Sequence, residues 1–188
     1  LLVRSFFRLQ QVSPGFNTES TLSFAMSLPE KNYPDAEPDK RINFFNQIKD
    51  KIQSLPGVMS VGLSSGLPLG NNGAQWSFSI VGQPVPSPQQ MPTMEFCVAD
   101  VGYFETLRIP LLRGRFFNEQ DNRAHLKPED LRGHSPAEVF LAGLRSIVID
   151  EEFARRHFPG EDPIGKQVRM GVRDDDPALT VVGVVGRV

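Results

Sequence analysis

The sequence has little of what usually reveals a protein's location or chemistry. It contains one cysteine, Cys97, so it cannot form an internal disulfide, and a lone thiol on an apparent strand is more typical of a small buried side chain than of a nucleophile. No stretch approaches 18 consecutive apolar residues, so no segment has the composition of a membrane-spanning helix. The 20 basic and 22 acidic residues leave a net charge of -2, which gives no reason to expect a nucleic-acid partner.

Motifs for catalysis and for phosphate or metal binding lack the context that they need. Gly62–Gly66 matches the G-x-S-x-G pattern of serine hydrolases, but a Gly-, Pro- and Asn-rich loop follows where that motif requires a helix. Gly160–Gln167 approaches the phosphate-binding pattern G-x-x-x-x-G-K-[ST], but Gln167 replaces the hydroxyl and two acidic residues would repel phosphate. The three histidines have no spacing typical of a zinc site. We therefore expect no enzymatic activity, no cofactor and no metal ion.

The first eleven residues predict an amphipathic helix. Leucines and phenylalanines fall on one helical face, and Arg4 and Arg8 lie four residues apart on another. Such a helix suits a membrane surface, the water-exposed end of a membrane helix that precedes it, or ordinary packing against its own domain.

The next 50 residues predict a βαβ unit. Alternating apolar and small polar residues predict a strand over Leu22–Leu28 with one buried face. Apolar residues spaced by three and four predict a helix over Asp39–Leu55, and Pro56-Gly57 would end it. Val58–Ser64 predicts a second strand, which a right-handed crossover would place parallel to the first.

A second lobe is expected to begin after the loop Leu67–Gly73. Trp76–Ile80 and Met94–Val98 alternate in the manner of strands, and the Pro-rich stretch Gly82–Pro92 between them is too long for a tight hairpin. Asp100 is placed to cap a short helix. The polar region that follows has its own capping box, S-P-A-E, at residues 135–138.

The most informative stretch is Ser146–Val185. It begins with S-I-V-I-D-E-E-F-A-R-R-H-F-P-G-E-D-P-I-G-K-Q-V-R-M-G and ends with L-T-V-V-G-V-V. The order of residues predicts a buried strand, a short helix capped by Asp150 and stopped at Pro159-Gly160, and a half-buried strand. The run Leu179–Val185 is nearly all apolar and β-branched, which predicts a strand covered on both faces.

This stretch resembles the MacB-type periplasmic core domain of ABC-transporter permeases of the FtsX-like class. Two further segments fit the same family in order: L-P-G-V-M-S-V-G-L-S-S-G-L-P-L from Leu55, and G-Y-F-E-T-L-R-I-P-L-L-R-G-R-F-F from Gly102. Together the three segments cover most of the chain.

The resemblance implies an α/β (α+β) fold with a mixed sheet and two lobes. On the family's template, residues 1–12 form a membrane-proximal helix and 13–66 form the first βαβ unit of a porter-like lobe. Residues 67–178 form an inserted α/β lobe, and residues 179–188 form the return strand. The second βαβ unit is absent, so we expect a C-terminally truncated porter-like lobe with an exposed strand edge, and either self-pairing of that edge or weak order near the C-terminus.

The resemblance also implies a non-catalytic role outside the cytoplasm. The domain would belong to an inner-membrane permease, with an ABC ATPase on the cytoplasmic side and transmembrane helices flanking the domain. It would relay ATP-driven motion to an external protein or lipid-linked cargo. The resemblance is also compatible with a homodimer. Two loops are the candidate partner-contact sites, through the residues Leu67, Leu69, Asn71, Asn72, Val85 and Met91. The alternatives from the residues themselves are a soluble periplasmic domain that binds a small ligand between its lobes and, behind it, a serine hydrolase at Ser64.

Overall fold

The structure, a computed structural model of the 188-residue chain, describes residues 15–17, 19–34, 38–68, 70, 74–121 and 143–187. The predicted N-terminal helix and the predicted capping box at residues 135–138 lie outside these residues.

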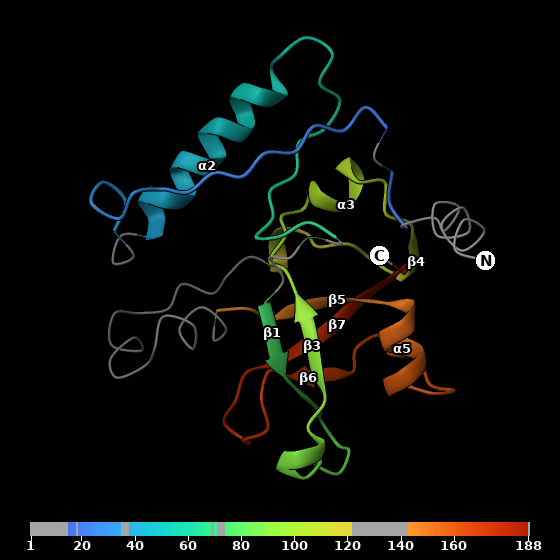
Figure 1. Cartoon of the computed structure of the whole chain (residues 1–188). Coiled ribbons are helices and arrows are strands. Elements are labelled where there is room, and N and C mark those ends of the chain that lie inside the picture. The colour runs from blue at the N-terminus through green and yellow to red at the C-terminus, as the bar shows by residue number, and fades with distance from the viewer. Residues whose placement is uncertain are drawn as a thin grey trace, which may run out of the picture.

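A five-stranded mixed sheet organises the described chain (Figure 1). Its strands are β2 (Ser79–Ile80), β4 (Leu111–Gly114), β5 (Ser146–Asp150), β6 (Gln167–Arg169) and β7 (Ala178–Val185). The strand β7 is central: β6 pairs antiparallel with its first half, β4 pairs antiparallel with its second half, and β5 pairs with it in parallel. Leu179, Val181, Val184 and Val185 of β7 are buried, whereas Thr180 and Val182 are half-buried. The strand predicted over Leu179–Val185 is confirmed, but only residues 183–185 are covered on both faces as predicted, because the first half alternates between buried and half-buried residues.

Two glycines let β4 and β7 cross closely. Gly114 has a φ of +70°, and a Cβ on it would lie 2.3 Å from the carbonyl oxygen of Val182. A Cβ on Gly183 would lie 2.2 Å from the carbonyl oxygen of Arg115. The register shifts between Leu111 and Arg113, as in a β-bulge. This strand was not predicted.

Helix α5 (Glu151–His157) packs on the sheet as the sequence predicts. Asp150 caps it, since its Oδ1 accepts a hydrogen bond from the backbone N–H of Phe153 at 2.6 Å. The rings of Phe153 and Phe78 lie 5.0 Å apart, centroid to centroid. They belong to the sheet cluster, a core built on Phe78, Val168, Met170, Leu179 and Val181.

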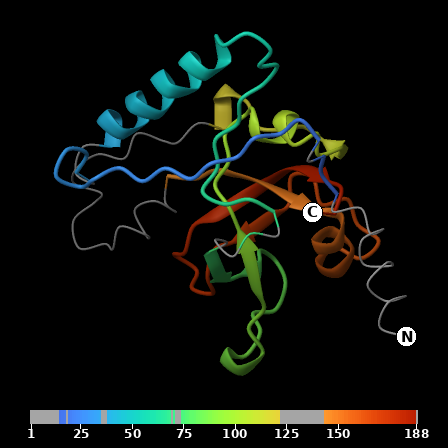
Figure 2. The ribbon, with the colours of Figure 1, turned by 45° about the horizontal axis from the view of Figure 1, so that its top comes forward.

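A two-stranded ladder crosses the sheet, formed by β1 (Ala74–Ser77) and β3 (Thr93–Phe96) (Figures 1 and 2). The first of the two predicted strands is thus divided at Phe78, since β1 pairs with β3 whereas β2 pairs with β6. The arm, Gly82–Pro92, joins β2 to β3 and contains the 3-10 helix η1 (Pro88–Gln90). It projects from the body at the end away from helix α2 (Pro38–Gln53).

The short helix α3 (Tyr103–Thr106) anchors a second core, the α3 cluster, made of Tyr103, Phe104, Leu107, Ile109 and Val185. Phe16 packs against this cluster, and the N–H of Asn17 donates to the carbonyl oxygen of Leu107 at 2.9 Å. Residues from both ends of the described chain therefore meet at one cluster.

Two strand predictions in the first 66 residues are wrong, although the helix between them is confirmed as α2. Leu22–Leu28 is extended but pairs with no described segment, and Leu22 and Phe24 are 87% and 62% exposed. Val58–Ser64 forms only one isolated bridge, between Ser64 and Ala99. Alternation predicts a strand only where a neighbouring strand completes the ladder, and the described residues supply none here.

The α+β class with a mixed sheet is confirmed. The division into lobes at residues 67 and 178 stays a prediction. Cys97, expected to be a small buried side chain, is exposed, with its Sγ 4.0 Å from the Tyr103 hydroxyl oxygen.

Candidate functional site

Asp100 joins α2, the segment after it and the start of α3. Its Oδ1 accepts hydrogen bonds from the backbone N–H groups of Leu63 and Gly102, both at 3.0 Å. Its Oδ2 accepts a hydrogen bond from the Lys49 ammonium on α2, and the two side chains form an ion pair. The N–H of Asp100 in turn donates to the carbonyl oxygen of Leu63 at 2.9 Å. We call Lys49, Leu63, Asp100 and Gly102 the joint. Asp100 was predicted as a helix cap, but Gly102 is the N-cap residue of α3 and no side chain caps that helix.

The joint also includes a close contact between two backbones. A Cβ on Gly62 would lie 2.6 Å from Tyr103 Cα, and a Cβ on Gly102 would lie 2.3 Å from the carbonyl oxygen of Val61. Only hydrogen atoms fit between these segments, so glycine is required on both sides. The contact leaves the segment after α2 little room to shift against α3.

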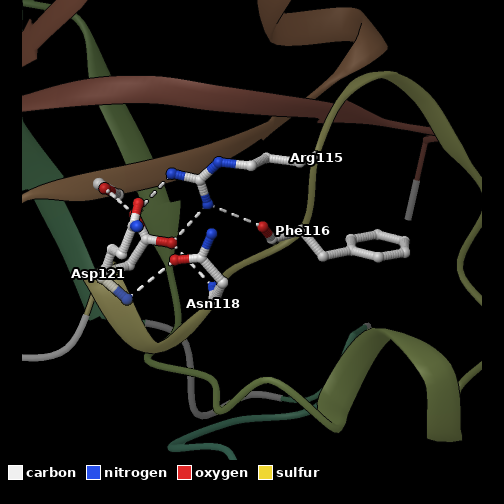
Figure 3. A network of polar contacts seen from close by, with 6 residues as sticks. Arg115, Phe116, Asn118 and Asp121 are labelled. Carbon is white, nitrogen blue, oxygen red and sulfur yellow. Dashed lines mark hydrogen bonds and ion pairs between the residues drawn. The ribbon is translucent and has the colours of Figure 1, made fainter.

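A polar network fixes the strand ends beside residues 122–142 (Figure 3). Asp121, in the 3-10 helix η2 (Glu119–Asp121), accepts two hydrogen bonds from the Arg115 guanidinium, at 2.5 and 3.1 Å. It also accepts from the Asn118 N–H at 2.8 Å and from the Ser146 hydroxyl at 2.5 Å. The hydrogen bonds from Arg115, with those from Ser146 and Asn118, lower the pKa of Asp121 to about 2. Asp121 is therefore ionised at neutral pH, and it ties the start of β5 to the loop after β4.

The structure separates the two loops that were predicted to contact a partner. Leu67 is 45% exposed and lies in the loop beside the joint, whereas Val85 is 55% exposed and lies on the arm. The two positions are at opposite ends of the β1–β3 ladder. Met91 is half-buried at the base of the arm. The other three candidates, Leu69, Asn71 and Asn72, lie outside the described residues.

The geometry around Ser64 does not match a nucleophile elbow. Its hydroxyl donates to the carbonyl oxygen of Gly66 at 2.6 Å, and among the described residues no strand leads directly into it and no helix starts directly after it. His157, on α5, packs against the rings of Phe78 and Phe153. Burial lowers the pKa of its imidazole, and the positive charge of Arg156 lowers it further. His125 and His134 lie outside the described residues. Within the part of the chain that the structure describes, no group of three His, Cys, Asp or Glu residues could hold a metal ion.

No helix among the described residues is long and apolar enough to cross a bilayer.

Comparison with known families gives a match along almost the whole chain. The sequence profile of the family described as MacB-like periplasmic core domain matches residues 8–187. The chain belongs to this family. A search of curated proteins finds no match.

Solved structures related to this MacB-like domain are distant in sequence. They include the periplasmic region of MacB from Actinobacillus actinomycetemcomitans, which is 16% identical with a TM-score of 0.45 over 73% of this chain and 48% of that one. The extracellular domain of the noncanonic ABC-type transporter YknZ from Gram-positive bacteria is 18% identical with a TM-score of 0.43 over 73% of this chain and 54% of that one. A domain of a putative permease protein from Porphyromonas gingivalis is 17% identical with a TM-score of 0.42 over 70% of this chain and 41% of that one. The matched region thus spans about half the length of these structures.

Sequence reasoning missed the joint. It assigned Asp100 to a local cap, and neither Lys49 nor Gly62 carried a signal, because their partners lie 51 and about 40 residues away along the chain.

Proposed function

We propose that this MacB-like domain is the extracytoplasmic domain of an ABC-transporter permease, and that it passes motion from the membrane to an external partner. The family match over residues 8–187 carries this proposal. The proposed setting is an inner membrane, with flanking transmembrane helices, an ATPase on the cytoplasmic side and a protein or lipid-linked cargo outside.

The arrangement of the described elements supports a relay. Val185 belongs to the α3 cluster and Phe16 packs against it, so a displacement applied near either end of the described chain acts on one packed core. The strand β7 ends in that cluster at Val185, and within the sheet it pairs with β6, which pairs with β2 at the base of the arm. A closely packed sheet transmits displacement because its interior has few voids to absorb it.

The arm has the features expected of a surface that contacts a partner. It contains four prolines and no charged residue, and its residue Val85 is exposed. Prolines restrict the backbone and lower the entropy lost on docking. We propose the arm as the contact for the external partner, and the loop at Leu67 as a second contact near the joint.

The relay is tested by measuring the distance from the arm to the bilayer during ATP hydrolysis. The longer permease would be prepared with its ATPase in nanodiscs, with its own cysteines replaced and Val85→Cys carrying a fluorescent donor. Acceptor-labelled lipids would report the height of the arm. The control is the same assembly with an ATPase that binds but does not hydrolyse ATP.

We expect energy transfer to differ between the nucleotide-free and vanadate-trapped states, while the distance between labels at Gln47 on α2 and Val85 stays constant. Energy transfer that is unchanged across these states would contradict the relay. A signal that shows no defined distance from the lipids would favour the soluble ligand-binding alternative.

A further inference from the structure

An apolar groove lies between β1 and the turn that joins β6 to β7. Its volume is about 270 Å³, and its apolar lining comes mainly from Trp76, Met91, Met170 and Pro177. Met170 is buried in the sheet cluster, and Trp76 packs against that cluster. The arm supplies one wall, through Met91, and the turn at residues 171–177 supplies another. A cavity of this size accepts one or two side chains, not a large ligand.

Along the edge that borders this groove, the backbone of β1 has N–H and C=O groups with no partner among the described residues. The N–H of Phe78 donates to the carbonyl oxygen of Pro92. By the register of the ladder, the backbone N–H and C=O groups of Phe78, Trp76 and Ala74 therefore point toward β3. Antiparallel pairing alternates, so the N–H and C=O groups of Gln75 and Ser77 face away from β3. The described residues contain no strand on that side of β1.

That side of β1 is in line with β6. The N–H of Val81 donates to the carbonyl oxygen of Gln167, and Ser79 pairs with Arg169, so alternate residues along this segment point toward β6. Ser77 and Gln75 continue the same alternation. However, β6 ends at Arg169, and the chain turns away at Gly171, whose φ is +131°. The groove therefore occupies the position where a strand that continued the line of β6 would lie.

We propose that an extended segment of a protein partner adds to the free edge of β1 and places an apolar side chain in this groove. The guest would run antiparallel to β1, as β6 runs to β2, and would pair with Gln75 and Ser77. Main-chain hydrogen bonds would supply affinity, and the groove would select the side chain. Trp76 and the two methionines favour an unbranched or aromatic side chain, because methionine adapts its shape to such partners.

The charges around the groove define a second feature of the guest. The turn beside the groove carries three acidic residues, Asp174, Asp175 and Asp176, and the basic residues are Arg173 in the turn and Arg169 at the end of β6; Asp176 and Arg173 line the groove itself. The guanidinium of Arg173 is already paired with Asp175, at 2.9 and 3.0 Å, and that of Arg169 donates to backbone oxygens of the turn. The surroundings are net acidic, so the guest carries Lys or Arg next to its apolar anchor.

This inference deepens the proposed function, because it rests on the domain having an external protein partner and states how that partner is held. The test uses the purified 188-residue chain without membrane or ATPase, so its result is independent of the energy-transfer experiment. The probe is a phage-displayed library of random linear twelve-residue peptides, followed by synthesis of the recovered peptides. Trp76 is the single tryptophan in the sequence, so its fluorescence reports directly on the groove.

We expect recovered peptides to share an apolar residue beside a Lys or Arg, and to change Trp76 emission with a Kd below about 1 mM. Binding should slow amide exchange at Gln75 and Ser77 at least tenfold. The amide of Trp76, which already pairs with Met94, should change little. Protection at those two amides distinguishes strand addition from side-chain contact alone.

Paired variants complete the test. Ser77→Pro removes the outward N–H and should weaken binding more than tenfold, whereas Ser77→Ala keeps it and should bind as the native chain does. Met91→Asp should weaken binding similarly, and Met91→Leu should not. The proposal is overturned if no peptide is recovered, if Gln75 and Ser77 remain unprotected, or if Met91→Asp binds like Met91→Leu.

Discussion

Replacing Asp121 with Asn should destabilise the domain by an amount that depends on pH. The carboxylate accepts four hydrogen bonds, two of them from Arg115, and its side chain is 7% exposed. Asparagine keeps the shape and one acceptor oxygen but removes the charge. The fall in the pKa of Asp121 from 3.8 to about 2 corresponds to about 2 kcal/mol. The Arg115 side chain is 43% exposed, so solvent screening lowers the expected loss at pH 7 to about 1–2 kcal/mol.

The direction of the pH dependence follows from the lowered pKa. A carboxyl group whose pKa is lower in the folded state stabilises that state above its ordinary pKa of 3.8, and this contribution disappears as the pH falls through about 2. The native chain and Asp121→Asn should therefore differ most at neutral pH and converge as the pH approaches 2.

Urea denaturation at several pH values measures this difference. At pH 7 a loss of about 1–2 kcal/mol corresponds to a melting temperature lower by about 2–8 °C for a domain of this size. Asp174→Asn is the matched control, because the exposed Asp174 carboxylate makes no hydrogen bond among the described residues, and it should change stability by less than about 0.5 kcal/mol. An equal loss at pH 7 and near pH 2.5 would refute the assignment of the effect to the Asp121 charge.

Three further changes test the joint and the cap of α5. Gly102→Ala should cost about 1–3 kcal/mol in urea denaturation, because its Cβ would lie 2.3 Å from the Val61 carbonyl oxygen; a neutral effect would contradict the close packing. Lys49→Met removes the ion pair of α2 with Asp100 and should speed amide exchange in α2 more than in β7, so equal changes in both would count against a specific tie. Asp150→Ala should cost about 1 kcal/mol through loss of the helix cap, whereas the exposed neighbour change Glu151→Gln should cost less than half of that; equal losses would refute the cap.

The C-terminal part of the fold was predictable because its signals are local. Asp150 caps α5 three residues from its hydrogen-bond partner, and Pro159-Gly160 follows the helix directly. The β-branched run of β7 needs burial whatever its neighbours are. Helix α2 was likewise predictable, because a helix satisfies its backbone within the segment.

Elements that depend on distant partners were not predictable. Leu22–Leu28 has the alternation of a strand, but a strand exists only with a neighbour, and no local signal says whether one is present. Strand β4 has the reverse character: its sequence L-L-R-G does not alternate and its residues are exposed, yet it pairs with β7 about 70 residues later. The joint and the groove combine residues from both halves of the chain, so no spacing along the sequence indicates either.

Cysteine labelling in cells determines directly on which side of the membrane the arm lies. In the proposed permease with its own cysteines replaced, including Cys97→Ser, Val85→Cys would be treated in intact cells with a membrane-impermeant maleimide. We expect Val85→Cys to be labelled without lysis once the outer surface of the inner membrane is accessible. A cysteine placed in the proposed ATPase partner should stay unlabelled. Labelling of Val85→Cys only after the inner membrane is broken would place the domain in the cytoplasm and contradict the account.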